Sequence, residues 1–275
     1  MLRGIYPDEN RDSAIHPYSH SRVFLLGRIP ESTKGLLRER ALSASGDASL
    51  LSAIRLNHNF SPLTSHFSLI PPLLIMRVIL VNDPSAVQEA VSALQQGFLI
   101  VYPTDTAYAL GVDSLNEPAL LAIQALKQRT VAKPLPLVAS DLAQVERFSE
   151  LSPRERLAAE QYWPGPLTLL VRPRSNVSQS ITLGRSRVGI RVPNSTFART
   201  LAANLGRPIV ATSANITGAG AQYSIQPLIS AFNGQSDAPA IFIDAGDLPE
   251  ILPSTIVEFL EDRAIIHRQG SIQIT

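Results

Sequence analysis

The segment LIVYPTDTAYALG, residues 99–111, places a polar cluster directly after a strongly apolar run. Its first four residues are apolar or aromatic, which is typical of a buried strand. Three residues with side-chain oxygens, Thr104, Asp105 and Thr106, follow after a single proline. In α/β sheets, ligands bind at the carboxyl ends of strands, so this cluster predicts a ligand site where the strand ends.

Strands and helices alternate on either side of this segment. Predicted strands cover residues 77–81, 98–102, 134–139, 167–171, 188–192, 208–212, 240–244, 254–259 and 264–268. Apolar residues at helical spacing predict four helices, which begin at or after Asp83, Asn116, Ser152 and Asn194. Because several neighbouring strands lack a helix between them, the sequence predicts an α/β domain with one mixed sheet.

Composition divides the chain of 275 residues near Met76. Residues 1–75 contain four of the five histidines, 8 of the 24 Lys and Arg residues and no sustained apolar period. From Met76 onward, 16 basic and 17 acidic residues give a formal charge of −1. We therefore predict that residues 1–75 are disordered or lie upstream of a true start at Met76, and that residues 76–275 form one domain. A transit peptide is the alternative for the first segment.

Several classes of protein are excluded by what the sequence lacks. There is no cysteine, which excludes disulfides and thiolate zinc sites. No apolar run reaches the roughly 18–20 residues that a membrane span needs. A phosphate-binding GxxxxGK[ST] loop is absent, and His267 is the one histidine after Met76, which argues against a histidine-based triad or metal cluster.

Two further clusters share features with the first. TSANITG, residues 212–218, also follows a predicted strand. Lys127, Arg129 and Lys133 close the second predicted helix, where basic residues also complement the helix dipole. On a continuous helix, positions 127 and 129 lie about 200° apart, so the two side chains can share an anion only if the helix ends between them. Thr, Ser and Asn also form caps and turns, so a structural role remains open for each cluster.

Taken in order, these segments resemble the motifs of the YrdC/YciO family, the L-threonylcarbamoyladenylate synthases. The matching segments are YPTDTAYALG, LKQR, KPLPL, WPGPLTLLV, VGIRVP, ATSANITG, PSTIV and RQGSI. The resemblance implies a twisted, open mixed sheet with flanking helices. It also implies a cytoplasmic enzyme that makes L-threonylcarbamoyladenylate and pyrophosphate from L-threonine, bicarbonate and ATP with Mg²⁺. The implied partners are the downstream tRNA threonylcarbamoyl transferase machinery and tRNA or double-stranded RNA.

The resemblance further implies which residues form the site. Lys127 and Arg129 match the family's basic motif and would be the catalytic pair. The residues expected to bind threonine and ATP are Thr104, Thr106, Lys133, Thr168, Arg191, Ser213, Asn215, Ser254 and Arg268. No protein ligand for a metal is implied, because Mg²⁺ accompanies ATP. Threonine carbamate is itself the nucleophile, so the protein needs to supply positioning and charge.

Departures from the family pattern keep other functions open. Ala109 stands where the family usually has glycine, and YALG resembles the YciO branch of the family. A diverged paralogue without synthase activity is therefore one alternative. An RNA-binding module without catalysis is another, although a charge of −1 after Met76 gives it no support.

Overall fold

The computed structural model describes residues 22–24, 76–127, 133–215, 220–235, 237–261 and 263–274. The strands are β1 Arg22–Phe24, β2 Met76–Leu80, β3 Ile100–Pro103, β4 Tyr108–Asp113, β5 Leu137–Val138, β6 Ser149–Glu150, β7 Leu167–Pro173, β8 Val188–Arg191, β9 Ile209–Ser213, β10 Ile241–Asp244, β11 Thr255–Leu260 and β12 Arg263–Arg268. The helices are α3 Ala86–Gln95, α4 Glu117–Leu126, α5 Leu142–Phe148, α6 Pro153–Tyr162, α7 Gln179–Thr182, α8 Thr196–Leu205 and α9 Ile225–Phe232.

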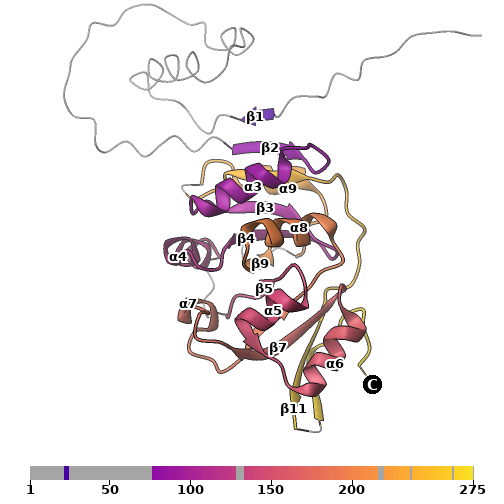
Figure 1. Cartoon of the computed structure of the whole chain (residues 1–275). Coiled ribbons are helices and arrows are strands. Elements are labelled where there is room, and N and C mark those ends of the chain that lie inside the picture. Colours follow the sequence, from indigo (N-terminus) through magenta and orange to yellow (C-terminus); the bar gives the residue numbers. More distant parts are fainter. Residues whose placement is uncertain are drawn as a thin grey trace, which may run out of the picture.

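The strands form one mixed sheet in the order β1-β2-β10-β3-β4-β9-β5-β8-β7-β11-β12, with β6 paired to β7 (Figure 1). β10 is parallel to both β2 and β3, and β11 is parallel to β7. β3–β4, β4–β9 and β7–β8 are antiparallel. The predicted α/β domain with a mixed sheet and flanking helices is thereby confirmed.

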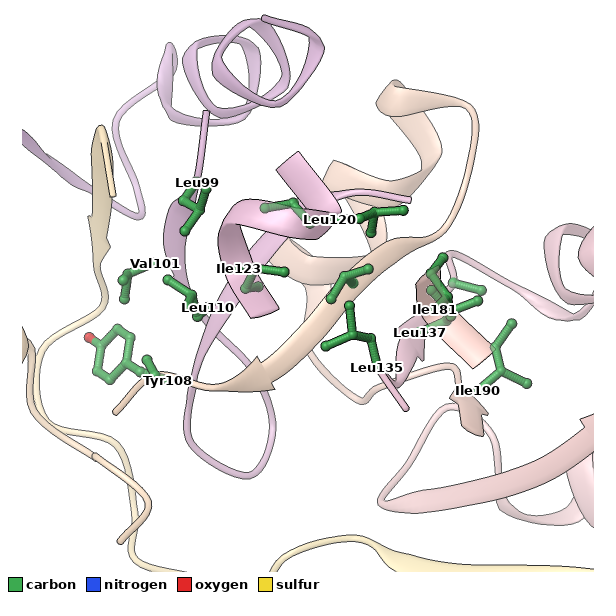
Figure 2. Packing of buried hydrophobic residues seen from close by; sticks show 14 of the residues in the cluster. Leu99, Val101, Tyr108, Leu110, Leu120, Ile123, Leu135, Leu137, Ile181 and Ile190 are labelled. Atoms are coloured by element: carbon green, nitrogen blue, oxygen red, sulfur yellow. The ribbon is translucent and has the colours of Figure 1, made fainter. Parts of the chain in front are cut away.

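Helices cover both faces of the sheet and bury two apolar cores. α3 and α8 pack on one face, in a core that includes Ile100 of β3. α4 and α9 contribute to the core on the other face, where Leu120 and Ile123 of α4 lie over Val101 and Leu110 of β3 and β4 (Figure 2). Successive strand residues point to opposite faces, which is why neighbours such as Ile100 and Val101 belong to different cores.

Local contacts fix several of the helix ends that the sequence predicts. Asn116 accepts the N–H of Ala119 at the start of α4, and Ser152 and Glu155 form a capping box at the start of α6. Gly206 ends α8 with a φ of 77°, a conformation that glycine adopts without steric cost. No helix within the described ranges is both long and apolar enough to cross a bilayer.

Two helices begin later than predicted. Asp83 caps a turn before α3, because its carboxylate accepts both the N–H and the hydroxyl of Ser85 at 2.8 Å. The helix then begins after Ser85. α8 begins after Ser195 and not Asn194, because the Ser195 hydroxyl accepts the N–H of Ala198.

The sequence does not predict β4, β6, α5, α7 or α9. All six residues of β4 are buried, so the strand shows no alternation of polar and apolar residues. Its conformation is fixed by β3 on one side and β9 on the other. A sheet with β4 at its centre follows from these two long ladders.

The extension before Met76 contains one described strand. β1 pairs antiparallel with β2, with Val23 opposite Arg77. The strands predicted from the sequence include none in residues 1–75, and residues 22–24 lie in the apolar patch RVFLLG. The rest of this segment lies outside the described residues.

Removal of residues 1–75 should have a small effect on stability. β1 supplies three paired residues at the edge of the sheet, whereas the two cores lie after Met76. We expect residues 76–275 to fold with a melting temperature about 2–4 °C lower, which corresponds to about 1 kcal/mol for a domain of this size. Thermal unfolding of the two chains tests this, and a decrease beyond about 10 °C would show that the extension packs on the core.

Candidate active site

The PTDT cluster forms the turn of a β-hairpin between β3 and β4. The Thr104 hydroxyl donates to the carbonyl oxygen of Ala107 at 2.7 Å and accepts the N–H groups of Thr106 and Ala107 at 3.2 and 3.3 Å. The hydroxyl oxygens of Thr104 and Thr106 lie 3.2 Å apart. Thr104 is therefore a turn-forming residue as well as a candidate site residue.

Arg191 lies at the end of β8, and its side chain contacts this turn. Its guanidinium donates to the Thr106 hydroxyl at 3.2 Å, and its other terminal nitrogen lies 3.0 Å from a carboxylate oxygen of Asp105. The second carboxylate oxygen of Asp105 accepts the N–H of Asn194 at 2.9 Å. The side chains of Asp105 and Arg191 are 9% and 10% exposed, so this is a nearly buried ion pair.

Lys127 is the C-terminal cap of α4, and its side chain reaches the end of β9. The ammonium donates to the carbonyl oxygens of Ser213 and Asn215, both at 2.8 Å, and to the side-chain oxygen of Asn215 at 2.5 Å. An ammonium has three N–H donors, and three acceptors lie within hydrogen-bond distance of it here. The Ser213 hydroxyl also donates to the side-chain oxygen of Asn215, at 3.0 Å. In this structure Lys127 orders the Ser-x-Asn segment.

A third group of side chains links β7, β11 and β12. The hydroxyl oxygens of Thr168 and Ser254 lie 2.8 Å apart and are buried. Arg268 donates to the hydroxyl and to the carbonyl oxygen of Ser254, both at 2.9 Å. This arrangement holds the Arg268 guanidinium beside two hydroxyl groups.

Direct contacts join the first and third groups, since Arg191 donates to the Thr106 hydroxyl and lies close enough to Arg268 to lower the pKa of that arginine. Ala109 pairs with Ser213, so the hairpin turn lies next to the end of β9. Leu169 pairs with Ile190, and one step further along the same antiparallel register Thr168 lies beside Arg191. The first and third groups thus form one polar area, and the end of β9 that carries Ser213 lies beside the same hairpin turn.

Two arginines give this area a positive potential. Burial lowers the pKa of Arg268, and the nearby positive charge of Arg191 lowers it further. Two neighbouring guanidinium groups that repel each other favour an anion between them. Burial raises the pKa of the Tyr102 phenol, whose oxygen lies buried near the Asp105–Arg191 pair without a hydrogen-bond partner.

Nine of the eleven predicted site residues take part in these groups. They are Thr104, Thr106, Lys127, Thr168, Arg191, Ser213, Asn215, Ser254 and Arg268. Lys133 is exposed and joins none of the contacts described above. Arg129 lies outside the described residues.

The residues expected from the resemblance did not include Asp105, although the PTDT cluster that contains it was predicted to be a ligand site. Asp105 could have been proposed from its position between the two threonines of the PTDT cluster. Its ion pair could not, because Arg191 is 86 positions away. Among the described residues, no cluster of three or more His, Asp or Glu residues could hold a metal ion.

A family model supports the same region. The model for Sua5, YciO and YrdC proteins, described as "Telomere recombination", matches residues 92–270, a range that includes every candidate site residue. The chain belongs to the Sua5/YciO/YrdC family. The resemblance seen in the sequence is therefore confirmed at the level of the family.

Relatives in this family include proteins named threonylcarbamoyl-AMP synthase. The one from Idiomarina loihiensis is 39% identical over 134 residues, 48% of this chain and 72% of its own. The one from Pyrococcus abyssi is 30% identical over 202 residues, and the match covers 71% of this chain and 58% of that protein. The present chain thus matches little more than half of the P. abyssi protein.

Solved structures of the family share the fold. Sua5 of P. abyssi, solved in complex with L-threonine, has a TM-score of 0.62 at 31% identity, covering 67% of this chain and 54% of its own. YciO of Escherichia coli has a TM-score of 0.61 at 25% identity, covering 68% of this chain and 89% of its own. This chain thus spans most of E. coli YciO and about half of P. abyssi Sua5.

Proposed function

We propose that this protein makes L-threonylcarbamoyladenylate from L-threonine, bicarbonate and ATP, with release of pyrophosphate and water. The observation that carries the proposal is the cluster in which Arg191 and Arg268 lie among the hydroxyl groups of Thr106, Thr168 and Ser254. Such a cluster of cations and hydroxyl groups suits anionic substrates with a small polar side chain. The names of the relatives, and the L-threonine bound to P. abyssi Sua5, support the choice of threonine.

The proposed chemistry needs positioning more than a protein nucleophile. The amino nitrogen of threonine bonds to the carbon of bicarbonate, and water leaves, which gives the carbamate. A carbamate oxygen then attacks the α-phosphorus of ATP, and the bond to the bridging oxygen breaks, so that pyrophosphate leaves with the electron pair. Both reactants are anions, so Arg191 and Arg268 would reduce their repulsion and hold them in line.

The remaining predicted residues would complete the site. Ser213 and Asn215, ordered by Lys127, would contact the nucleotide, and Arg129 and Lys133 would add positive charge near the phosphates. Mg²⁺ would enter with ATP and neutralise phosphate charge. We assign it no protein ligand, because the carboxylate of Asp105 is already paired with Arg191. The product would pass to the tRNA threonylcarbamoyl transferase machinery in the cytoplasm.

Omission of single substrates tests the proposal. With labelled bicarbonate, we expect threonylcarbamoyl-AMP and pyrophosphate only when L-threonine, bicarbonate, ATP and Mg²⁺ are all present. Liquid chromatography with mass spectrometry detects the product, and a pyrophosphate assay measures the leaving group. Equal pyrophosphate release without threonine would contradict the proposal.

A diverged YciO-type function is the second candidate. YciO of E. coli shares the fold, with a TM-score of 0.61 at 25% identity. The methyl group of Ala109, opposite Ser213, also occupies a position where the family usually has glycine. A folded protein that makes no product in the omission assay would favour this candidate. RNA binding by such a protein would favour the third alternative, a binding module.

A further inference from the structure

Asp105 lies at the centre of the hairpin turn, in contact with two separate segments of the chain. One of its carboxylate oxygens lies 3.0 Å from a terminal nitrogen of Arg191, and the other accepts the N–H of Asn194. Both oxygens face protein groups, so the side chain is directed away from solvent. Asp105 therefore contacts a candidate site residue without being an obvious substrate ligand itself.

The Asp105–Arg191 contact is an ion pair with poor hydrogen-bond geometry. Three buried polar atoms here have no hydrogen-bond partner: the Tyr102 phenol oxygen, the inner oxygen of Asp105 and the facing nitrogen of Arg191. Buried polar atoms are usually paired, and exceptions often mark sites where function outweighs stability. If stability were the sole requirement, apolar side chains at these two positions would be more favourable than a buried ion pair.

The charges around Arg191 explain why it needs Asp105. Arg268 is close enough for its pKa to be lowered by the charge of Arg191. The carboxylate of Asp105, 3.0 Å from Arg191, offsets part of this positive charge and so reduces the repulsion while holding the guanidinium in place. Thr106 offers a single neutral acceptor, at 3.2 Å, which cannot balance a charge.

We propose that Asp105 is a positioning residue, which fixes the Arg191 guanidinium at the distance from Arg268 that a substrate anion needs. This inference rests on the proposed function only in assigning a substrate anion to Arg191. Asp105 does not contact the substrate; it acts through Arg191. A purely structural role, in which Asp105 merely ties the turn to Asn194, is the competing explanation.

A double-mutant cycle separates the two explanations. Asp105→Asn removes the charge but keeps an oxygen that can accept the N–H of Asn194. Arg191→Lys and the double variant complete the cycle. For each protein, calorimetry gives the Kd for ATP and for L-threonine, kinetics give kcat and KM, and thermal unfolding gives the melting temperature.

The matched control is Asp113→Asn. Asp113 forms a similar ion pair with Arg207, but at the opposite end of β4 and β9 from the candidate site. Asp113→Asn should lower the melting temperature and leave the Kd values for ATP and for L-threonine unchanged. Should Asp105→Asn unfold at the assay temperature, Asp105→Glu replaces it in the cycle, because it keeps the charge and displaces it by one methylene group.

We expect Asp105→Asn to weaken binding or lower kcat/KM for at least one substrate on the order of 10- to 100-fold, since small misplacements of a binding group have effects of this size. The double variant should be no worse than Arg191→Lys alone. Additive losses, or near-normal constants in Asp105→Asn, would overturn the positioning role. Binding without product formation in the unaltered protein would contradict the proposed function but leave the cycle readable through Kd. If the unaltered protein bound neither ATP nor L-threonine, both the proposed function and the positioning role of Asp105 would be contradicted.

Discussion

Replacement of Lys127 by methionine should remove most of the activity and also destabilise the fold. The ammonium makes three charge-assisted hydrogen bonds to Ser213 and Asn215, and methionine makes none. Such bonds contribute about 1.5–3 kcal/mol each, but Ser213 and Asn215 are partly accessible to water. We therefore expect a loss of about 3 kcal/mol, or about 6–12 °C in melting temperature for a domain of this size.

The effect on activity should be on the order of 100-fold or more in kcat/KM, because the Ser-x-Asn segment loses the group that orders it. Rates of threonylcarbamoyl-AMP formation and thermal unfolding measure the two effects. Lys133→Met is the matched stability control, since it makes the same change at an exposed lysine and should leave the melting temperature unaltered. If Lys127→Met kept the stability of the unaltered protein and lost only activity, Lys127 would act on the substrate directly rather than through Ser213 and Asn215.

Arg129→Lys should lower kcat/KM by about 10- to 150-fold while stability barely changes. Arginine can bind a phosphate or carboxylate through two parallel hydrogen bonds, whereas lysine offers a single point charge. The loss of one charge-assisted hydrogen bond costs about 1.5–3 kcal/mol, which corresponds to this range of rates. If Arg129 only complemented the helix dipole, it would contribute about 0.3–1 kcal/mol to stability, and lysine would preserve that contribution.

α4 ends at Leu126 with Lys127 as its cap, and Arg129 lies outside the described residues. Steady-state kinetics for threonine and ATP, together with the melting temperature of Arg129→Lys, test the prediction. Kinetic constants near those of the unaltered protein would leave Arg129 with a role at the helix end alone.

Much of the fold could be predicted from the sequence, because the deciding contacts are local. Asn116, Ser152 and Gly206 fix helix ends through hydrogen bonds or backbone conformations that involve only a few neighbouring residues. The apolar runs of β3 and β9 identify buried strands, and the polar clusters that follow them mark the edge of the sheet where the candidate site lies. The motifs, taken in order, identified the family.

Tertiary structure decided the rest. β4 is a strand because β3 and β9 pair with it on both sides, and its uniform burial removes the alternation that a sequence could show. Three-dimensional contacts also gave Lys127 its three acceptors, 86 and 88 positions away. The pairing of Asp105 with Arg191 is likewise absent from any local pattern, because the strength of an ion pair depends on distance and burial in space, and sequence separation determines neither.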